Sequence, residues 1–214
     1  MNTQAKAPND VSRPGRSVHL EPLNPSHITD LYESIGSNAE LWTFVPDGPF
    51  NDKDSFHHFI AAASQAEGVF IYALIDQPTK KALGVLMLMH LDLKNRSVEV
   101  GIIFSPLLQR TTAATEALYL LSKTVFDDLG FRRFEWKCCD TNESSKRAAA
   151  RYGFTREGVF RQHMIVKGRN RDTVWYSMID SEWPAFRKAY ESWLDPANFD
   201  DQGRQRQSLA SFRA

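Results

Sequence analysis

Residues 104–117 (FSPLLQRTTAATEA) have the composition and spacing of a site for an anionic ligand. The segment is typical of a strand end, a short loop and a helix start. The first turn of a helix carries unpaired N–H groups and a partial positive charge. Small residues at positions 111–114 would let a ligand approach that backbone, and Arg110 adds a full charge. The segment by itself predicts a phosphate-binding helix start, although many helices with small first turns bind nothing.

The elements that must position this segment follow from hydrophobic periodicity and from breaker residues. Strands are expected over residues 18–22, 69–75, 82–91, 97–104, 132–139, 154–166 and 173–179. Helices are expected over residues 27–35, 52–66, 111–129, 142–152 and 183–194. A strand–helix–strand crossover lies between antiparallel hairpins. This order predicts one mixed α/β domain with a mostly antiparallel sheet of about seven strands, flanked by helices.

Length and charge limit the possible classes. The 214 residues suit one well-buried domain, expected over residues 17–194. Residues 1–16 are polar, without the apolar core of a secretory signal, and are expected to be a disordered lead-in. Residues 195–214 are expected to be a flexible tail. Lys plus Arg equals Asp plus Glu at 26 each, which disfavours a nucleic-acid binder.

Three further properties bear on the location, metal content and oligomeric state of the protein. No apolar run approaches the roughly 18–20 residues of a membrane span, so no membrane partner is expected. The adjacent Cys138 and Cys139 lack further ligands at metal-binding spacing, so no metal is expected. They are interpreted as reduced thiols of a cytoplasmic protein. The amphipathic helix over residues 183–194 leaves monomer and homodimer both open.

Three blocks along the chain carry a resemblance to a known family. The loop Gln109, Arg110, Thr111, Thr112, Ala113, Ala114 matches a Q/R-x-x-G-x-G/A pattern, and Thr115, Glu116 and Ala117 continue it. An N-x-x-S…GF block follows at Asn142, Ser145, Gly153 and Phe154. Over roughly residues 18–183 the chain resembles the GNAT superfamily of acetyl-CoA-dependent N-acetyltransferases. It is most similar to the branch of the ribosomal-protein N-terminal alanine acetyltransferases.

The resemblance implies a GNAT fold whose sheet is splayed where acetyl-CoA, the cosubstrate, binds. The residues that it assigns to the coenzyme are Phe104, Gln109, Arg110, Thr111, Thr112, Ala113, Ala114, Thr115 and Asn142. One departure concerns the loop, because the family usually has Gly where this chain has Thr112, and often at Arg110 too. Either these side chains share the phosphate binding, or the loop binds the coenzyme weakly or differently.

The resemblance also implies direct attack of an amine on the thioester. Glu99 is the candidate general base because it lies on the strand that leads into the loop. The alternative is a solvent-facing residue, since Val98 and Val100 would face the core. Ser145 is the candidate hydrogen-bond donor to the departing thiolate, or else a plain first-turn residue. Glu135 is a second possible base, with an exposed or ion-paired alternative.

The acceptor side is predicted less sharply. Trp42, Phe44 and Asp47 lie in a loop that lines the acceptor site in this fold; the alternative is a satellite core. Arg161 and His163 precede a basic hairpin tip, residues 167–172, which could recognise an acidic partner or RNA or be simply solvated. The function predicted is acetyl transfer to a primary amine, on a protein N-terminus or a small molecule. The alternative is a non-catalytic acyl-CoA-binding or regulatory domain on the same fold.

Overall fold

The computed structural model describes residues 4–213 and contains one mixed sheet of eight strands with five α-helices. The strand order is β1-β2-β3-β4-β5-β6-β8-β7, and β5–β6 is the one parallel pair among these strands. The mixed α/β class and the mostly antiparallel sheet are confirmed. The eighth strand, β1 (Arg13–Pro14), was not predicted; it pairs with β2 over two residues.

The remaining elements agree with the expected order. The strands are β2 (Val18–Pro22), β3 (Phe70–Asp76), β4 (Ala82–Asp92), β5 (Ser97–Phe104), β6 (Arg133–Cys139), β7 (Thr155–Val166) and β8 (Arg169–Ile179). The helices are α1 (Ile28–Leu31), α2 (Lys53–Gln65), α3 (Thr112–Lys123), α4 (Glu143–Tyr152) and α5 (Trp183–Leu194). π-helical turns extend α1 over Tyr32–Gly36 and α3 over Thr124–Asp128. Short 3₁₀ helices cover Pro25–His27, Ala39–Trp42, Pro196–Asn198 and Leu209–Phe212.

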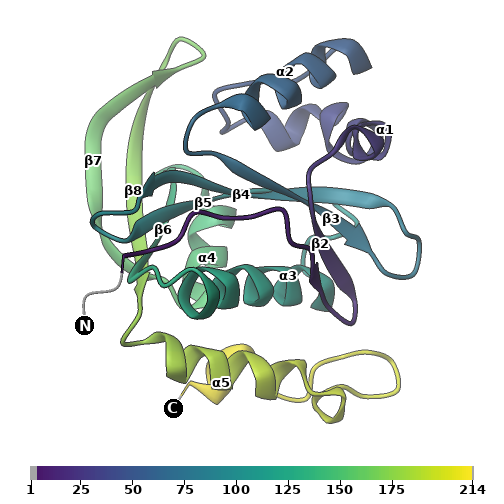
Figure 1. Ribbon diagram of the computed structural model, residues 1–214, viewed down its shortest axis with the longest axis vertical. Helices are drawn as coiled ribbons and strands as arrows, with labels where there is room; N and C mark the ends of the chain where they lie inside the picture. The colour runs from purple at the N-terminus through teal and green to yellow at the C-terminus, as the bar shows by residue number, and fades with distance from the viewer. Residues whose placement is uncertain (1–3, 214) are drawn as a thin grey trace.

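Helices cover the two faces of the sheet unequally (Figure 1). One face packs on α3 and α4, with α5 beyond them, and holds the larger apolar core. The stripe predicted for α3 lies in this core, with Ala117, Leu118 and Leu121 fully buried. The other face packs on α1 and α2 through a smaller core that includes Ile103. The β7–β8 hairpin rises on the same side as α1 and α2 (Figure 1).

The sheet opens between its two parallel strands. The β5–β6 ladder runs from Ser97 opposite Arg133 to Val100 opposite Trp136, and its register ends there. Residues 101–104 continue β5 and residues 137–139 continue β6 without pairing with each other. This gap, with its vertex at Val100 and Trp136, is the splay that the resemblance implied.

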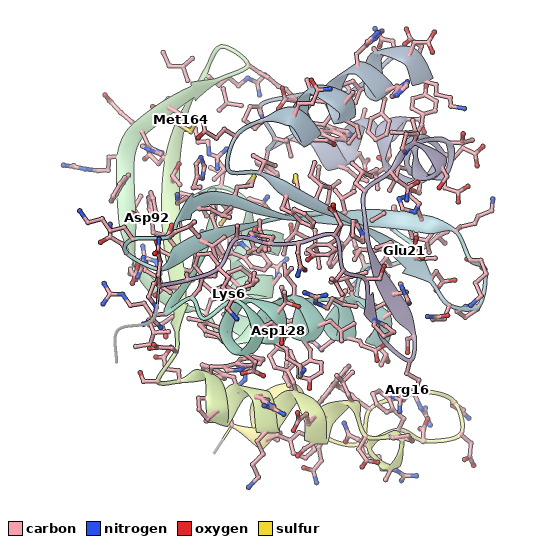
Figure 2. The ribbon with its side chains drawn as sticks, viewed as in Figure 1. Lys6, Arg16, Glu21, Asp92, Asp128 and Met164 are labelled. Atoms are coloured by element: carbon pink, nitrogen blue, oxygen red, sulfur yellow. The ribbon has the colours of Figure 1, made fainter. Side chains whose placement is uncertain are left out.

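Both ends of the described chain make defined contacts. The Lys6 N–H donates to the Leu129 carbonyl at 2.8 Å, and Lys6 lies close to Asp128 beside α3 (Figure 2). The Arg16 guanidinium donates to the Leu194 carbonyl at the end of α5. In the predicted tail, Leu209 is only 1% exposed. Residues 1–3 and 214 lie outside the described residues, and the boundaries 17–194 stay a prediction.

The N-terminal segment is also tied to α3 by a buried carboxylate. Glu116 accepts hydrogen bonds from the backbone N–H groups of Arg16, Ser17 and Val18 at 2.8, 2.6 and 3.3 Å. Its side chain is almost fully buried. A buried carboxylate needs such partners, so this contact fixes the chain start against the helix. No helix among residues 4–213 is long and apolar enough to cross a membrane.

Candidate active site

The start of α3 is shaped by a side-chain cap. Thr111 is the N-cap residue: its hydroxyl accepts from the Ala114 N–H at 3.1 Å and donates to the Leu108 carbonyl at 2.7 Å. Gln109 donates its amide to the Phe104 carbonyl at 2.9 Å and so links the loop to the end of β5. These contacts place the loop and the first turn of α3 directly beyond the splay.

Four consecutive backbone N–H groups have no acceptor within the part of the chain that the structure describes. They belong to Arg110, Thr111, Thr112 and Ala113. Helix N-termini leave such donors unpaired, and the helix dipole adds positive potential at the same point. The arrangement suits a phosphate or pyrophosphate group.

Arg110 has a left-handed backbone, with φ of 62°. Glycine adopts this region without strain, whereas other residues pay roughly 1–2 kcal/mol. The departure from the family pattern therefore has a conformational cost at this position. The Arg110 side chain is exposed and adds a charge that glycine lacks. Thr112 opens α3 with ordinary helical geometry, so Gly is not needed there for the backbone.

Two of the predicted coenzyme residues are already engaged within the fold. Thr115 is 1% exposed, and its hydroxyl accepts from the Arg151 guanidinium at 3.0 Å. Ala114 is equally buried against the core. Ala114 and Thr115 anchor the start of α3 to the core, whereas residues 110–113 carry the unpaired N–H donors. Whether each residue contacts the coenzyme stays a prediction.

Ser145 lies beside the vertex of the splay. It is in the first turn of α4, and the Asn142 side chain caps that turn by accepting from the Ser145 N–H at 3.0 Å. The Trp136 indole N–H donates to the Ser145 hydroxyl at 3.0 Å. Because Trp136 fixes the Ser145 oxygen as an acceptor, the hydroxyl proton remains available for donation.

Glu99 is buried, not solvent-facing. Its side chain is 8% exposed and accepts from Lys137 Nζ at 2.6 Å and from His90 Nδ1 at 2.7 Å. Strand alternation places Glu99 on the face of Ile103, beneath α1 and α2. Ser145 on α4 lies on the other face. Glu99 and Ser145 therefore flank the vertex from opposite sides of the sheet.

Glu99 begins a chain of charged residues along the sheet. Lys137 Nζ lies 3.6 Å from Glu135 and 3.7 Å from the centre of the Trp175 ring. Glu135 accepts from Arg133 at 2.7 Å, and Arg133 also binds Glu157. The Arg133 guanidinium and the Ser177 hydroxyl hold the pKa of Glu157 below its usual range. We call residues 99, 133, 135, 137 and 157 the charged floor.

Cys138 is unsuited to covalent catalysis. It is 5% exposed, and burial raises the pKa of its thiol. A thiol that stays protonated is a weak nucleophile. Among residues 4–213, no group of three or more His, Cys, Asp or Glu side chains is placed to hold a metal ion.

On the acceptor side, the loop that contains Trp42 closes against the tip of the β7–β8 hairpin. Trp42 is fully buried and donates its indole N–H to the Ile35 carbonyl, so its ring serves the smaller core. Phe44 is 37% exposed and borders a cavity of about 430 Å³. Asp47 is exposed and does not line this cavity. The cavity lining is Ala39, Trp42, Thr43, Phe44, Pro49, Cys139, Thr141, Val166, Lys167, Arg169, Asn170 and Arg171.

The other two predicted acceptor residues lie in an irregular part of β7. The register shifts between Phe160 and Met164, which leaves Arg161 and His163 in a bulge. His163 Nδ1 lies 3.0 Å from the Thr173 hydroxyl, and its ring packs on Phe160 and Trp175. Neither Arg161 nor His163 lines the cavity, and their acceptor role stays a prediction.

The sequence reasoning missed Lys137 and Trp136 as site residues. Glu135 and Lys137 are two positions apart on one strand and so share a face. That spacing could have predicted the ion pair between Glu135 and Lys137. The other partner of Lys137, Glu99, lies 38 positions earlier in the chain, and no local pattern links the two. The hairpin tip and the 39–49 loop form one cavity, and no pattern in either segment of the sequence predicts that they meet.

Comparison with known proteins agrees with this geometry. The family model described as acetyltransferase (GNAT) domain matches residues 17–155. The chain belongs to the GNAT acetyltransferase family, as the resemblance implied, and is an N-acetyltransferase. Bacillus subtilis (strain 168) has a relative named "Putative ribosomal N-acetyltransferase YdaF". It is 25% identical over 169 residues, covering 77% of this chain and 90% of the relative.

Two solved structures extend the comparison. A GCN5-related N-acetyltransferase from Brucella melitensis superposes with a TM-score of 0.94 at 43% identity, over 99% of this chain and 98% of that one. A spermidine N-acetyltransferase from Vibrio cholerae, solved with CoA and spermine, has a TM-score of 0.65 at 17% identity. That match covers 77% of this chain and 96% of the other. The second likeness shows the shared fold alone.

Proposed function

We propose that this protein transfers an acetyl group from acetyl-CoA to a primary amine by direct attack in a ternary complex. The observation that carries the proposal is the placement of Glu99 and Ser145 on opposite sides of the splay vertex. The four unpaired N–H groups of residues 110–113 lie at the open end of the same splay. A base, an acid and an anion site thus surround one gap in the sheet.

The start of α3 would hold the coenzyme pyrophosphate on these N–H groups. Arg110 and the Thr112 hydroxyl would add side-chain contacts that replace the close backbone approach of a glycine-rich loop. Asn142 would keep its capping role and lie along the coenzyme arm. This assignment rests on the unpaired donors and on the family pattern.

The chemistry needs one proton transfer on each face. Glu99 would accept a proton from the acceptor ammonium, directly or through a water, and the amine nitrogen would then bond to the thioester carbon. The unpaired backbone edge of residues 101–104 would donate to the oxyanion. As the carbon–sulfur bond breaks, Ser145 would donate its proton to the leaving thiolate and regain one from water. The nitrogen would lose its second proton to water, so that the products are the neutral amide and the CoA thiol. No covalent enzyme intermediate is required.

The acceptor is proposed to be a protein N-terminus. The name of the relative YdaF, a ribosomal N-acetyltransferase, supports this choice. The alternative acceptor is a small-molecule amine. A non-catalytic binding role is disfavoured, because the buried Glu99 and the fixed Ser145 oxygen would then have no use beside the vertex. We further propose a cytoplasmic location, with monomer and homodimer both compatible.

A thermal-shift titration followed by a turnover assay tests the proposal. Acetyl-CoA and CoA should each raise the unfolding temperature, and ATP should not, because ligand binding stabilises the folded state. Thiol release across a panel of amines and peptide N-termini should then show turnover with at least one acceptor. The absence of a shift with either coenzyme would overturn the coenzyme site. A shift without thiol release on any amine would overturn catalysis and leave the binding role.

A further inference from the structure

The cavity between the 39–49 loop and the β7–β8 hairpin tip is lined by cations. Lys167, Arg169 and Arg171 all contribute, and no Asp or Glu is among the lining residues that the structure describes. The hairpin tip stands above the sheet on the side of α1 and α2, beyond the level of Met164 on β7 (Figures 1 and 2). This lining concentrates positive charge in one concave place.

The fold leaves this charge without a counterion. Lys167 Nζ donates to the Trp42 carbonyl at 2.7 Å, and Arg171 Nη1 donates to the Phe44 carbonyl at 3.4 Å. These carbonyls are neutral. No carboxylate among residues 4–213 lies within 4.0 Å of the three cations. The Nε of Arg171 is buried and has no hydrogen-bond partner in the described chain. A buried, unpaired donor is costly unless a ligand satisfies it.

The charged floor has the opposite balance. It contains three carboxylates, Glu99, Glu135 and Glu157, against two cations, Lys137 and Arg133. His90 Nδ1 also contacts the Glu99 carboxylate at 2.7 Å. An ammonium above Glu99 would add a further cation and would stand where the proposed base must receive its proton. The two regions thus differ in charge: carboxylates are in excess beside the vertex, and cations are in excess in the cavity at the hairpin tip.

The two regions are linked through the end of β6. Cys139 and Thr141 line the cavity. Lys137 of the floor precedes them by a few residues, and Asn142 and Ser145 follow directly. A ligand with its amine at the vertex would therefore extend past the end of β6 towards the basic rim.

From these observations we infer that the acceptor carries an anionic group beside its amine, namely a carboxylate of the same small molecule or peptide. The inference rests on the proposed function and names the substrate class of that site. Arg169 and Arg171 bind the carboxylate, and Lys167 holds the 39–49 loop in place. Because guanidinium groups pair with carboxylates in fixed geometry, they select this class. A polyamine places a second cation against the rim and is disfavoured.

Matched tetrapeptides test the inference. The wild-type protein is assayed by thiol release with Ala-Asp-Asp-Phe amide, with Ala-Asn-Asn-Phe amide and with spermidine, and aspartate serves as a free small-molecule acceptor. The kcat/KM of the acidic peptide should exceed that of the neutral peptide by about tenfold. A tenfold ratio corresponds to about 1.4 kcal/mol, which we expect from one ion pair. Spermidine should be the poorest acceptor. Aspartate carries its amine and its carboxylates on one residue, whereas the acidic peptide carries them on different residues. The ratio of their kcat/KM values therefore tells which source of carboxylate is used.

Variants Arg169→Gln and Arg171→Gln should each raise the KM for the acidic peptide by about tenfold. The KM for acetyl-CoA should be unchanged, and the KM for the neutral peptide should rise less than the KM for the acidic peptide. Arg156→Gln, an exposed cation at the start of β7 away from the cavity, is the matched control. Arg171→Lys keeps the charge if Arg171→Gln does not fold.

Three results would overturn the inference. The first is equal use of the acidic and neutral peptides by the wild-type protein. The second is a raised KM for acetyl-CoA in the variants, since the cations would then serve the coenzyme phosphates. The third is binding of a short RNA in place of the acidic peptide. If no amine is acetylated at all, the proposed function fails separately. Calorimetric titration of the acidic peptide into the CoA-bound protein then still decides the inference.

Discussion

The proposed coenzyme side and the proposed acceptor side of the splay are built differently by the chain. The coenzyme side consists of two short continuous segments, residues 109–115 and 142–145, each at the start of a helix. The acceptor side is assembled from the 39–49 loop, the end of β6 and the β7–β8 tip, more than 120 positions apart at the extremes. The first side uses backbone donors that any helix start provides. The second depends on particular side chains brought together by the fold.

If this comparison holds, changes beside the vertex should alter turnover, and changes at the start of α3 should alter coenzyme affinity. The largest effect is expected for Glu99→Gln, because loss of a general base typically costs about a hundredfold or more in rate. kcat should fall by that amount, while the dissociation constant of acetyl-CoA stays unchanged. Steady-state kinetics and a coenzyme titration measure the two quantities.

The control for Glu99 is Glu135→Gln, which alters the same charged floor one strand away. Its Lys137 contact is longer, at 3.6 Å against 2.6 Å for Glu99, so its effect on kcat should be much smaller. Equal losses in both variants would mean that the floor acts through its total charge. Unchanged turnover in Glu99→Gln would remove Glu99 as the base.

A smaller effect is expected for Ser145→Ala, about tenfold to a hundredfold in kcat, since the thiolate would lose its proton donor. The Trp136 indole N–H would also lose its acceptor, so thermal unfolding should show a loss of about 1–3 kcal/mol. Ser144→Ala is the matched control. The Ser144 hydroxyl donates to the Asn142 side chain at 2.8 Å, whereas Trp136 donates to Ser145. A stable Ser145→Ala variant with full turnover would contradict the assigned role.

The smallest effect is expected at Arg110. Replacement by Ala keeps the left-handed strain and removes the charge, so acetyl-CoA affinity should fall by about three- to tenfold. Replacement by Gly should lower affinity equally while raising the free energy of unfolding by about 1 kcal/mol, because glycine tolerates φ of 62°. Titration calorimetry and urea unfolding separate the two effects. An affinity unchanged in both variants would assign the site to backbone donors alone.

The sequence predicted the coenzyme side because its signals are local. The helix over residues 111–129 follows from its apolar stripe, and Thr111 and Asn142 are residue types that commonly cap helices. Both caps are present. The family pattern then assigned the loop to the coenzyme. Even the departure at Arg110 was visible, although its backbone strain was not, because φ depends on how Gln109 and Thr111 anchor the loop.

The proposed acceptor side was predicted only in part, because its contacts join residues that lie far apart in the sequence. Glu99 was predicted as the candidate base, with a solvent-facing residue as the alternative that strand alternation left open. The fold covers it with Lys137 from the adjacent strand. Trp42 was recognised as an aromatic loop residue, yet its burial depends on Ile35 and the helices around it. The hairpin tip was predicted as basic. That it faces the 39–49 loop follows only from the tertiary structure.

The bond between Glu116 and the N-terminal segment joins residues about 100 positions apart in the chain. Because Glu116 belongs to the second turn of α3, opening of the segment around Ser17 would expose a buried carboxylate in the helix whose first turn is proposed to bind the coenzyme. Opening of the N-terminal segment and loosening of α3 are therefore coupled. We therefore expect a ligand that stabilises α3 to lower the rate of amide hydrogen exchange at the beginning of β2. Removal of β1 and β2 should in turn weaken the binding of that ligand.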